Sequence, residues 1–291
     1  MKSISIALVA SVLNITFTGD ILLDRGVRSV IERHGIDCLF TPAIDSVFRQ
    51  SQVVVGNLEC PATRVNAPVF KRFIFRAEPE WLTALQRHGI THLNLANNHA
   101  IDQGREGLMD TRNNIINAGM VAVGAGATMK EASQPVLLAE EPRKVWLLTS
   151  VRMTLENFAW LDDRPSVSQE PMDSLLQRVR RMKAEDSTAV VIVSLHWGAE
   201  HTLKPVAAQR LDAHRLIDAG ADALVCHHTH TMQTEETYRG KPIYYSIGNF
   251  IFDQTNPVNC DAAIVSLTIT SNTLTSQTLP ITIKKCVPHI R

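Results

Sequence analysis

This chain of 291 residues has no excess of charge of either sign. It contains 29 basic and 29 acidic residues, and no run of like charges occurs along it. Binding to nucleic acid or to an anionic membrane surface needs a basic patch, so the charge pattern argues against both kinds of partner. A hydrophobic content of 45% also excludes a disordered chain, and the sequence predicts an ordinary globular protein.

The N-terminal apolar run, Ile4–Leu13, is too short to span a bilayer, because a membrane-spanning helix needs about 20 apolar residues. The run follows a single basic residue, Lys2, and little room for a cleavage site remains before Gly19-Asp20. We therefore expect no membrane span and a cytoplasmic location. Export through a weak N-terminal signal is the alternative.

The five cysteines are odd in number, widely spaced and never arranged as C-x-x-C. This pattern predicts neither a disulfide framework nor a structural zinc site, and it fits a reducing compartment.

No internal repeat, low-complexity tract or flexible linker divides the chain, which predicts a single domain over residues 1–291. Short apolar runs predict buried strands at Ile15–Thr18, Gln52–Val55, His92–Leu95, Val121–Val123, Val136–Ala139, Lys144–Leu148, Ala189–Leu195 and Ala223–Cys226. Helix-period segments predict helices at Pro79–His88, Arg105–Ala118, Met172–Ala184 and Pro205–Ala219. This alternation indicates an α/β fold, and the strand-like segments Pro242–Ile247, Ala262–Thr270 and Thr273–Ile283 predict an antiparallel ending.

Potential metal ligands stand directly after five of the predicted strands. The strand-end motifs are Gly19-Asp20, Gly56-Asn57-Leu58-Glu59, Asn97-Asn98-His99, His196-Trp197-Gly198-Ala199-Glu200 and Cys226-His227-His228-Thr229-His230. Taken singly, several are also typical of turns, helix caps or a core histidine. Because functional groups gather beyond the carboxyl ends of strands in open α/β sheets, the motifs together favour one shared site.

The ligands expected at this site are carboxylates, amides and imidazoles. A mixed oxygen and nitrogen set suits manganese, iron, zinc or magnesium, whereas copper(I) and iron–sulfur clusters need thiolates. The set is larger than one ion requires, so it predicts a centre of two divalent ions. Such a centre clamps the attacking and leaving oxygens of a phosphoryl transfer, and hydrolysis of a phosphoester is the first chemistry to consider.

The order of these motifs, continued by Ile247-Gly248-Asn249-Phe250, resembles the CapA family of capsule and poly-γ-glutamate biosynthesis proteins. That family is similar in fold to the calcineurin-like metallophosphoesterases. The resemblance runs from about Ile15 to Gln254. It implies a sandwich of mixed β-sheets flanked by helices, and a hydrolase acting on a phosphoester or a related acidic, polymer-linked substrate such as poly-γ-glutamate.

The resemblance also implies roles for individual residues. By this likeness, Asp20, Asn98, His196, His228 and His230 are metal ligands, and Asn57 with Glu59 stands at the bridging position. His99 resembles the histidine that protonates the leaving oxygen or stabilises the transition state. The residues expected to line the substrate site are His227, Glu200 and Asn249.

Two positions differ from active phosphoesterases of this superfamily. Leu22 stands where they have a histidine, and Asn57 stands where they have an aspartate. Both differences remove a ligand. They keep a second hypothesis open, in which the chain is a non-catalytic subunit that binds polyglutamate or another assembly component through a degenerate metal site.

Overall fold

The computed structural model describes residues 11–291, so residues 4–10 of the N-terminal apolar run lie outside it. The larger of its two main sheets has eight strands. Their spatial order is β16 (Val287–Ile290), β15 (Leu274–Lys284), β14 (Asp261–Ile269), β1 (Leu13–Ile21), β2 (Val53–Leu58), β3 (His92–Asn94) and β4 (Val121–Val123), with β13 (Asn249–Ile251) also paired to β1. Strands β1 to β4 run parallel, so their carboxyl ends share one edge.

The smaller main sheet has six strands, and its central members are also parallel. Their order is β11 (Glu236–Tyr238), β12 (Lys241–Tyr244), β10 (Ala223–Val225), β9 (Val190–His196), β7 (Val145–Val151) and β6 (Val136–Ala139). A two-stranded sheet joins β5 (Ala125–Gly126) to β8 (Ser166–Val167). The α-helices are α1 (Arg25–His34), α2 (Pro42–Arg49), α3 (Leu82–Arg87), α4 (Gly104–Asn117), α5 (Met129–Ala132), α6 (Met172–Glu185), α7 (Ala207–Ala219) and α8 (Pro257–Cys260).

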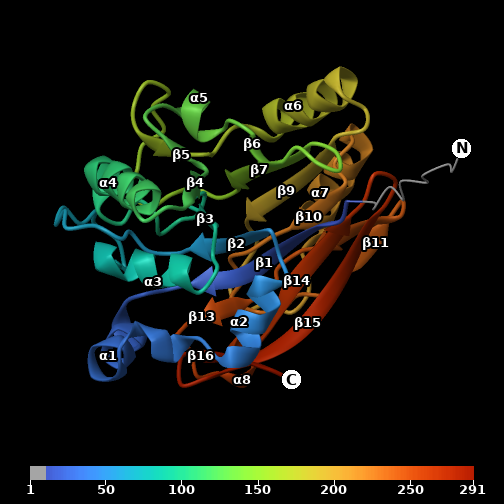
Figure 1. The fold of residues 1–291 in the computed structure, drawn as a ribbon. Coiled ribbons are helices and arrows are strands. Elements are labelled where there is room, and N and C mark those ends of the chain that lie inside the picture. The colour runs from blue at the N-terminus through green and yellow to red at the C-terminus, as the bar shows by residue number, and fades with distance from the viewer. Residues whose placement is uncertain (1–10) are drawn as a thin grey trace, which may run out of the picture.

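The two main sheets pack face to face, with helices on the outside of each (Figure 1). Between the sheets, Phe17 and Val55 share an apolar core with Ile192 and Val225. A second core lies between the larger sheet and α1 to α4, and a third lies between the smaller sheet and helices α6 and α7. Burial of apolar side chains on both faces of each sheet explains why its strands are near-continuous hydrophobic runs.

Local signals in the sequence set the helix ends. Asp24 caps α1 by accepting a hydrogen bond from the Arg25 backbone N–H, and the chain leaves the helix through Gly35 at a φ of 76°. Thr41 caps α2 in the same way, and Pro42 occupies the first turn, where no backbone donor is needed.

The predicted strands and helices are confirmed, and one strand lies in a different sheet from the one expected. Each of the eight apolar runs overlaps a strand, and each helix-period segment overlaps a helix. The antiparallel ending is confirmed for β14, β15 and β16. Pro242–Ile247 overlaps a strand, β12, but this strand lies in the smaller sheet, where it pairs antiparallel with β11 and parallel with β10.

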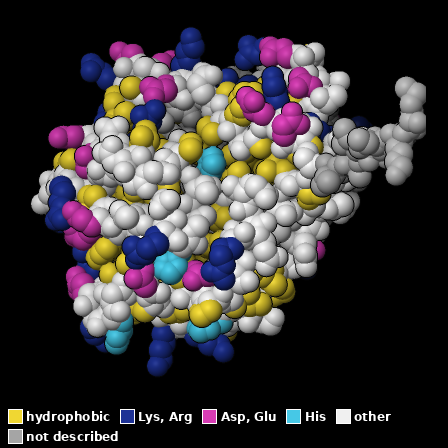
Figure 2. All heavy atoms as spheres, in the orientation of Figure 1, with side chains coloured by type: hydrophobic (Ala, Val, Ile, Leu, Met, Phe, Trp, Pro, Cys, Tyr) yellow, Lys and Arg dark blue, Asp and Glu magenta, His cyan; other side chains and the backbone are white. Residues whose placement is uncertain are grey.

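The surface agrees with the balanced charge of the sequence. On the face drawn in Figure 2, basic and acidic side chains are interspersed over the molecule. Within residues 11–291, none of the helices is both long and apolar enough to cross a membrane.

A buried carboxylate ties the smaller sheet to α6. Asp222 accepts hydrogen bonds from Lys183 at 3.1 Å, from Lys241 at 2.6 Å and from the Val191 backbone N–H at 3.0 Å. Burial opposes ionisation, but these donors outweigh it and hold the pKa of Asp222 below its usual 3.8. The stability that this carboxylate contributes is therefore complete above about pH 5 and is lost as the pH falls through its folded-state pKa.

We expect Asp222→Asn to lower the free energy of unfolding by about 2 kcal/mol at pH 7, because charge-assisted hydrogen bonds are lost. The deficit relative to the parent should shrink toward pH 3. Urea denaturation at both pH values measures this. Asp218→Asn, which removes an exposed ion pair with Arg239, is the control and should change stability by less than about 0.5 kcal/mol. An equal effect of both substitutions would contradict the assignment.

Candidate metal centre

A row of polar side chains crosses four adjacent strands at the carboxyl edge of the larger sheet. Asp20 of β1 is in register with Asn57 of β2 on one side and with Asn249 of β13 on the other. Asn57 is in turn in register with Asn94 of β3. All four side chains are buried. The row explains why polar residues end strands that are otherwise apolar.

Gly19 makes this row possible. A Cβ atom at Gly19 would lie 2.1 Å from the carbonyl oxygen of Gly248, which no side chain tolerates. The absence of a side chain lets the Gly248-Asn249 segment approach β1 closely, and the Asp20 backbone N–H donates to the Gly248 carbonyl at 3.1 Å. The Gly19-Asp20 motif therefore serves strand packing as well as chemistry.

Two groups of three buried side chains are arranged as metal ligands. One group is Glu59, His196 and His228, and the other is Asp20, Glu59 and His230. Within each group the potential ligand atoms lie within 4.8 Å of one another. Glu59 belongs to both groups, so its carboxylate is placed to bridge two ions.

Among the described residues, three of the four carboxylate oxygens of Asp20 and Glu59 lack a hydrogen-bond donor. Both oxygens of Glu59 and the Oδ2 atom of Asp20 are buried and have no hydrogen-bond partner among the described residues. An unpaired buried carboxylate costs several kcal/mol of free energy, so such atoms call for a cation. Together with nearby imidazoles, they fit divalent metal ions well.

Without a metal, the acidic and basic groups of the centre share protons. Burial and the charge of Asp20 raise the pKa of Glu59 well above its usual value. Burial also opposes ionisation of Asp20, but His227 and His230, each 3.3 Å from one of its oxygens, hold the pKa of Asp20 well below its usual value. Burial lowers the pKa of His230, but Glu59 and Asp20 outweigh it and raise that pKa to about 9. The same negative field attracts divalent ions.

The other two histidines are held in the neutral form that binds metals. Burial and the neighbouring His228 lower the pKa of His196 well below its usual value. Burial and His230 lower the pKa of His228 to about 3. The two rings approach closely, with 3.1 Å between His228 Nδ1 and His196 Nε2. Asn98 Oδ1 lies 2.8 Å from the same His196 nitrogen, so a half-buried amide oxygen adds a further potential ligand.

Asn57 has a different role from the one that the family resemblance implies. Its Oδ1 atom accepts hydrogen bonds from the amides of Asn94 and Asn97, both at 3.2 Å. Its Nδ2 atom therefore points the other way and donates to Asp20 Oδ1 at 2.8 Å. Because an N–H group cannot coordinate a cation, this orientation assigns the bridging position to Glu59 and makes Asn57 a donor that positions Asp20.

His99 is part of a buried charged cluster beside the ligands. Its Nδ1 atom lies 2.9 Å from Asp102 Oδ2, and its ring packs on Phe75 at a centroid distance of 4.4 Å. Lys71 donates to Asp102 Oδ1 at 2.8 Å and to the Asn98 carbonyl at 3.0 Å, with only 3% of its side chain exposed. Burial lowers the pKa of His99, and Asp102 opposes this shift. The Asp102 contact fixes the imidazole and leaves its Nε2 atom for proton transfer.

A cavity of about 370 Å³ opens next to these residues. Lys71, Asn98, His228 and the exposed Glu156 and Glu200 are among the residues that line it, and we call it the Lys71 cavity. Glu200 therefore lies at a cavity beside the centre, and its contact with a substrate stays a prediction.

His227 and Asn249 lie elsewhere than the sequence predicts. His227 is buried against Asp20, and Asn249 holds His230, with 2.9 Å between Asn249 Oδ1 and His230 Nδ1. Neither residue lines the Lys71 cavity. Both side chains instead contact residues of the two ligand groups, His227 beside Asp20 and Asn249 beside His230.

Sequence reasoning missed three residues of this site. Asp102 and Asn94 carry a weak signal, because Asp102 lies three residues after His99 and Asn94 ends a buried strand. Lys71 carries none: it belongs to a long segment without helix or strand periodicity. Only the folded chain brings it to His99.

Comparison with protein families identifies relatives of this chain. The profile of the family described as "Bacterial capsule synthesis protein PGA_cap" matches residues 14–254. The "PGA biosynthesis protein CapA" of Bacillus subtilis is 32% identical over 281 residues, which covers 95% of this chain and 73% of that protein. The "Capsule biosynthesis protein CapA" of Bacillus anthracis is 32% identical over 284 residues, with 95% and 69% covered.

Among solved structures, the NAD nucleotidase of Haemophilus influenzae is similar in fold, with a TM-score of 0.53 and 10% sequence identity. The match covers 94% of this chain, and the chain spans 56% of the length of that protein. At this identity the likeness concerns the fold alone. It confirms the predicted α/β sandwich of the metallophosphoesterase type.

Proposed function

This chain belongs to the PGA_cap family of bacterial capsule synthesis proteins, and on this basis we propose that it is a metal-dependent hydrolase of a phosphoester linkage. The observation that carries the proposal is the pair of ligand groups joined by Glu59, whose buried oxygens have no donor among the described residues. A structural role for five charged or ionisable side chains, buried together, would leave their desolvation cost uncompensated.

Each part of the centre has a proposed task. Glu59, His196 and His228 would hold one divalent ion together with Asn98, and Asp20, Glu59 and His230 would hold the other. Manganese, iron, zinc and magnesium all suit this set. When bound, the ions supply Lewis-acid activation of water and of the phosphoryl oxygens.

His99 transfers the proton. Asp102 accepts the hydrogen bond from its Nδ1 atom and orients the ring, so Nε2 is the atom that delivers a proton to the leaving oxygen. Lys71 balances the charge of Asp102 and holds the Asn98 carbonyl, which keeps the ligand Asn98 and the proton donor His99 in a fixed relation.

The biological substrate follows from the family by analogy. Relatives carry the name of PGA biosynthesis proteins, so an acidic polymer such as poly-γ-glutamate, or a phosphorylated precursor of it, is the proposed partner. We propose a cytoplasmic site of action and a single domain over residues 1–291.

A binding or assembly subunit is the second candidate. Leu22 and the amide nitrogen of Asn57 present no ligand atom to the centre, so this chain offers fewer ligands than related phosphoesterases. A chain that binds metal and γ-linked glutamate polymer, yet hydrolyses no phosphoester, would favour this candidate.

Manganese-reconstituted protein tests the hydrolase proposal. We expect elemental analysis to find two ions per chain, one for each ligand group. The loaded chain should unfold at a higher temperature than the EDTA-treated chain, because the ions bind the folded state. It should also hydrolyse 4-nitrophenyl esters of phosphate, and EDTA should abolish this activity. A chain that binds no metal would contradict the proposal.

A further inference from the structure

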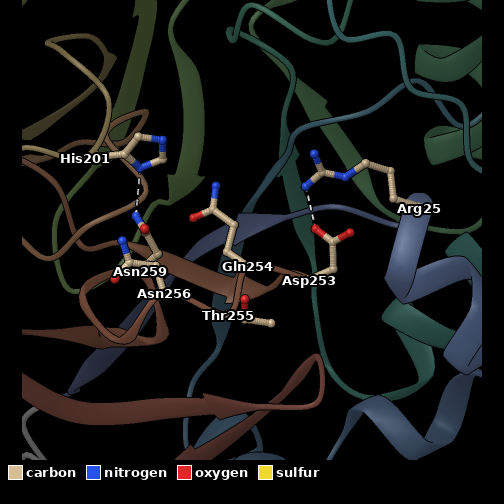
Figure 3. A pocket seen from close by; sticks show the side chains of 7 residues that line it. All are labelled: Arg25, His201, Asp253, Gln254, Thr255, Asn256 and Asn259. Carbon is tan, nitrogen blue, oxygen red and sulfur yellow. Dashed lines mark hydrogen bonds and ion pairs between the residues drawn. The ribbon is translucent and has the colours of Figure 1, made fainter.

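A second polar cavity, of about 460 Å³, lies next to the centre (Figure 3). Arg25, from the start of α1, and His201 stand at its two sides, and residues 253–256 form its floor. We call it the Arg25 cavity. It meets the centre through Asn259, whose amide donates to the His230 carbonyl at 2.8 Å and lies 3.0 Å from His201 Nδ1.

The two cavities reach the centre at different residues. His228 and Glu200 line the Lys71 cavity, whereas His201, the next residue along the chain, lines the Arg25 cavity. The ring centroid of His230 lies 6.3 Å from that of His228 and also 6.3 Å from that of His201. One cavity, of about 370 Å³, therefore reaches the centre at His228, and the other, of about 460 Å³, adjoins it through His201 and Asn259.

Arg25 is fixed relative to the centre by its packing. Its guanidinium lies 4.9 Å from the Phe75 ring centroid and 5.5 Å from that of Phe252. These two rings pack in turn on His99 and His230, at 4.4 Å and 4.7 Å. Arg25 also has a φ of 52°, a strained backbone conformation for a residue with a side chain. A guanidinium held in this way is preorganised to contact a ligand.

The charges of the two cavities limit the substrate. Arg25 is paired with Asp253, and Lys71 is paired with Asp102. The Lys71 cavity adds the carboxylates of Glu156 and Glu200, and the Arg25 cavity adds the neutral side chains of Gln254, Thr255 and Asn256. Among the described lining residues, then, neither cavity has a lysine or arginine without a carboxylate partner. A phosphomonoester carries a charge near −2 at pH 7, and apart from the metal ions it would find no unpaired lysine or arginine to balance that charge. A phosphodiester carries only −1, so it needs less compensation.

From these observations we infer that the centre acts on a phosphodiester inside a longer molecule, with one unit bound in the Lys71 cavity and the other in the Arg25 cavity. The inference rests on the proposed hydrolase function. A water oxygen forms the new bond to phosphorus, and the bond from phosphorus to one ester oxygen breaks. That oxygen leaves as an alcohol with a proton from His99, and the product on the other side is a phosphomonoester. The proton released by water returns to His99 through solvent.

Two substrates with the same leaving group test the inference. Bis(4-nitrophenyl) phosphate is a diester and 4-nitrophenyl phosphate is a monoester. The two differ only in the second nitrophenyl unit and the charge, so their kcat/KM values show the combined effect of these two features. We expect the manganese-loaded chain to have a kcat/KM at least about tenfold higher for the diester. Thr255→Trp, which places a large side chain in the lining of the Arg25 cavity, should lower the ratio of diester to monoester kcat/KM by about tenfold or more. Thr275→Trp, on an exposed position of β15, is the matched control and should leave both values unchanged.

The outcomes separate this inference from the function on which it rests. Turnover of the monoester as fast as the diester, or an unchanged ratio in Thr255→Trp, would overturn the inference and leave the hydrolase proposal intact. Failure of the metal-loaded chain to hydrolyse either ester would overturn the hydrolase proposal, and this inference with it.

Discussion

Glu59→Gln should reduce the metal content from two ions per chain to fewer than one. Glu59 is common to both ligand groups, and glutamine keeps its shape while replacing one ligand oxygen with an N–H donor. Asp20→Ala and His228→Ala each disrupt only one group, so both should retain about one ion. Elemental analysis of the manganese-reconstituted variants measures this difference directly. Phosphoesterase activity of Glu59→Gln should fall by at least about 10³-fold, because both ions take part in the reaction.

Glu200→Gln is the control for this substitution, because Glu200 is exposed and belongs to neither group. It should keep both ions. The near-UV circular dichroism of Glu59→Gln, compared with that of the metal-free parent, checks that the variant is folded. A Glu59→Gln chain that still binds two ions would contradict the bridging assignment. The bridging position would then belong to Asn57. Its amide would have to flip, which would break the hydrogen bonds that Asn57 Oδ1 accepts from Asn94 and Asn97.

His99→Ala should reduce turnover without reducing metal content. Removal of a proton donor costs about 10²- to 10⁴-fold in rate. The loss should be greatest for an ester with an alkyl leaving group, which must be protonated as it departs. It should be much smaller for a 4-nitrophenyl ester, whose leaving group departs as a stable anion. Steady-state kinetics with the two kinds of ester, together with metal analysis, measures both effects.

The dependence on leaving group separates proton transfer from a structural role of His99. A merely structural role would slow both esters equally. His289→Ala, on the edge strand β16, provides a control that should leave turnover and metal content unchanged. Equal losses with both esters in His99→Ala would show that another group protonates the leaving oxygen.

The sequence by itself determined the order of most strands and helices, and it contained the motifs that meet in the candidate centre. Apolar runs of strand length and segments of helical period predict the α/β sandwich, because burial on both sheet faces demands near-continuous hydrophobic strands. Asp20, Glu59, His196, His228 and His230, which form the two groups of potential ligands, all belong to the strand-end motifs of the sequence. Parallel strands bring their carboxyl ends to one edge of the sheet, so residues that follow different strands lie close together in the folded chain.

The role of Asn57 was not predictable from its position at a strand end. The direction in which an amide points depends on its neighbours, and Asn94 and Asn97 approach Asn57 only when β2, β3 and the following turn are packed together. The family resemblance implies that His227 and Asn249 line the substrate site, but in the folded chain both are buried, His227 beside Asp20 and Asn249 beside His230.

Tertiary structure alone decided the surroundings of the centre. Lys71 and Arg25 come from segments whose sequence pattern carries no sign of the site, and they reach it through contacts with Asp102 and with Phe75 and Phe252. Metal ligands must converge within a few ångströms, so their residue types and strand positions leave a trace in the sequence. Cavities depend instead on which loops meet above the strand ends, and loop conformation is set by long-range packing that no local pattern encodes.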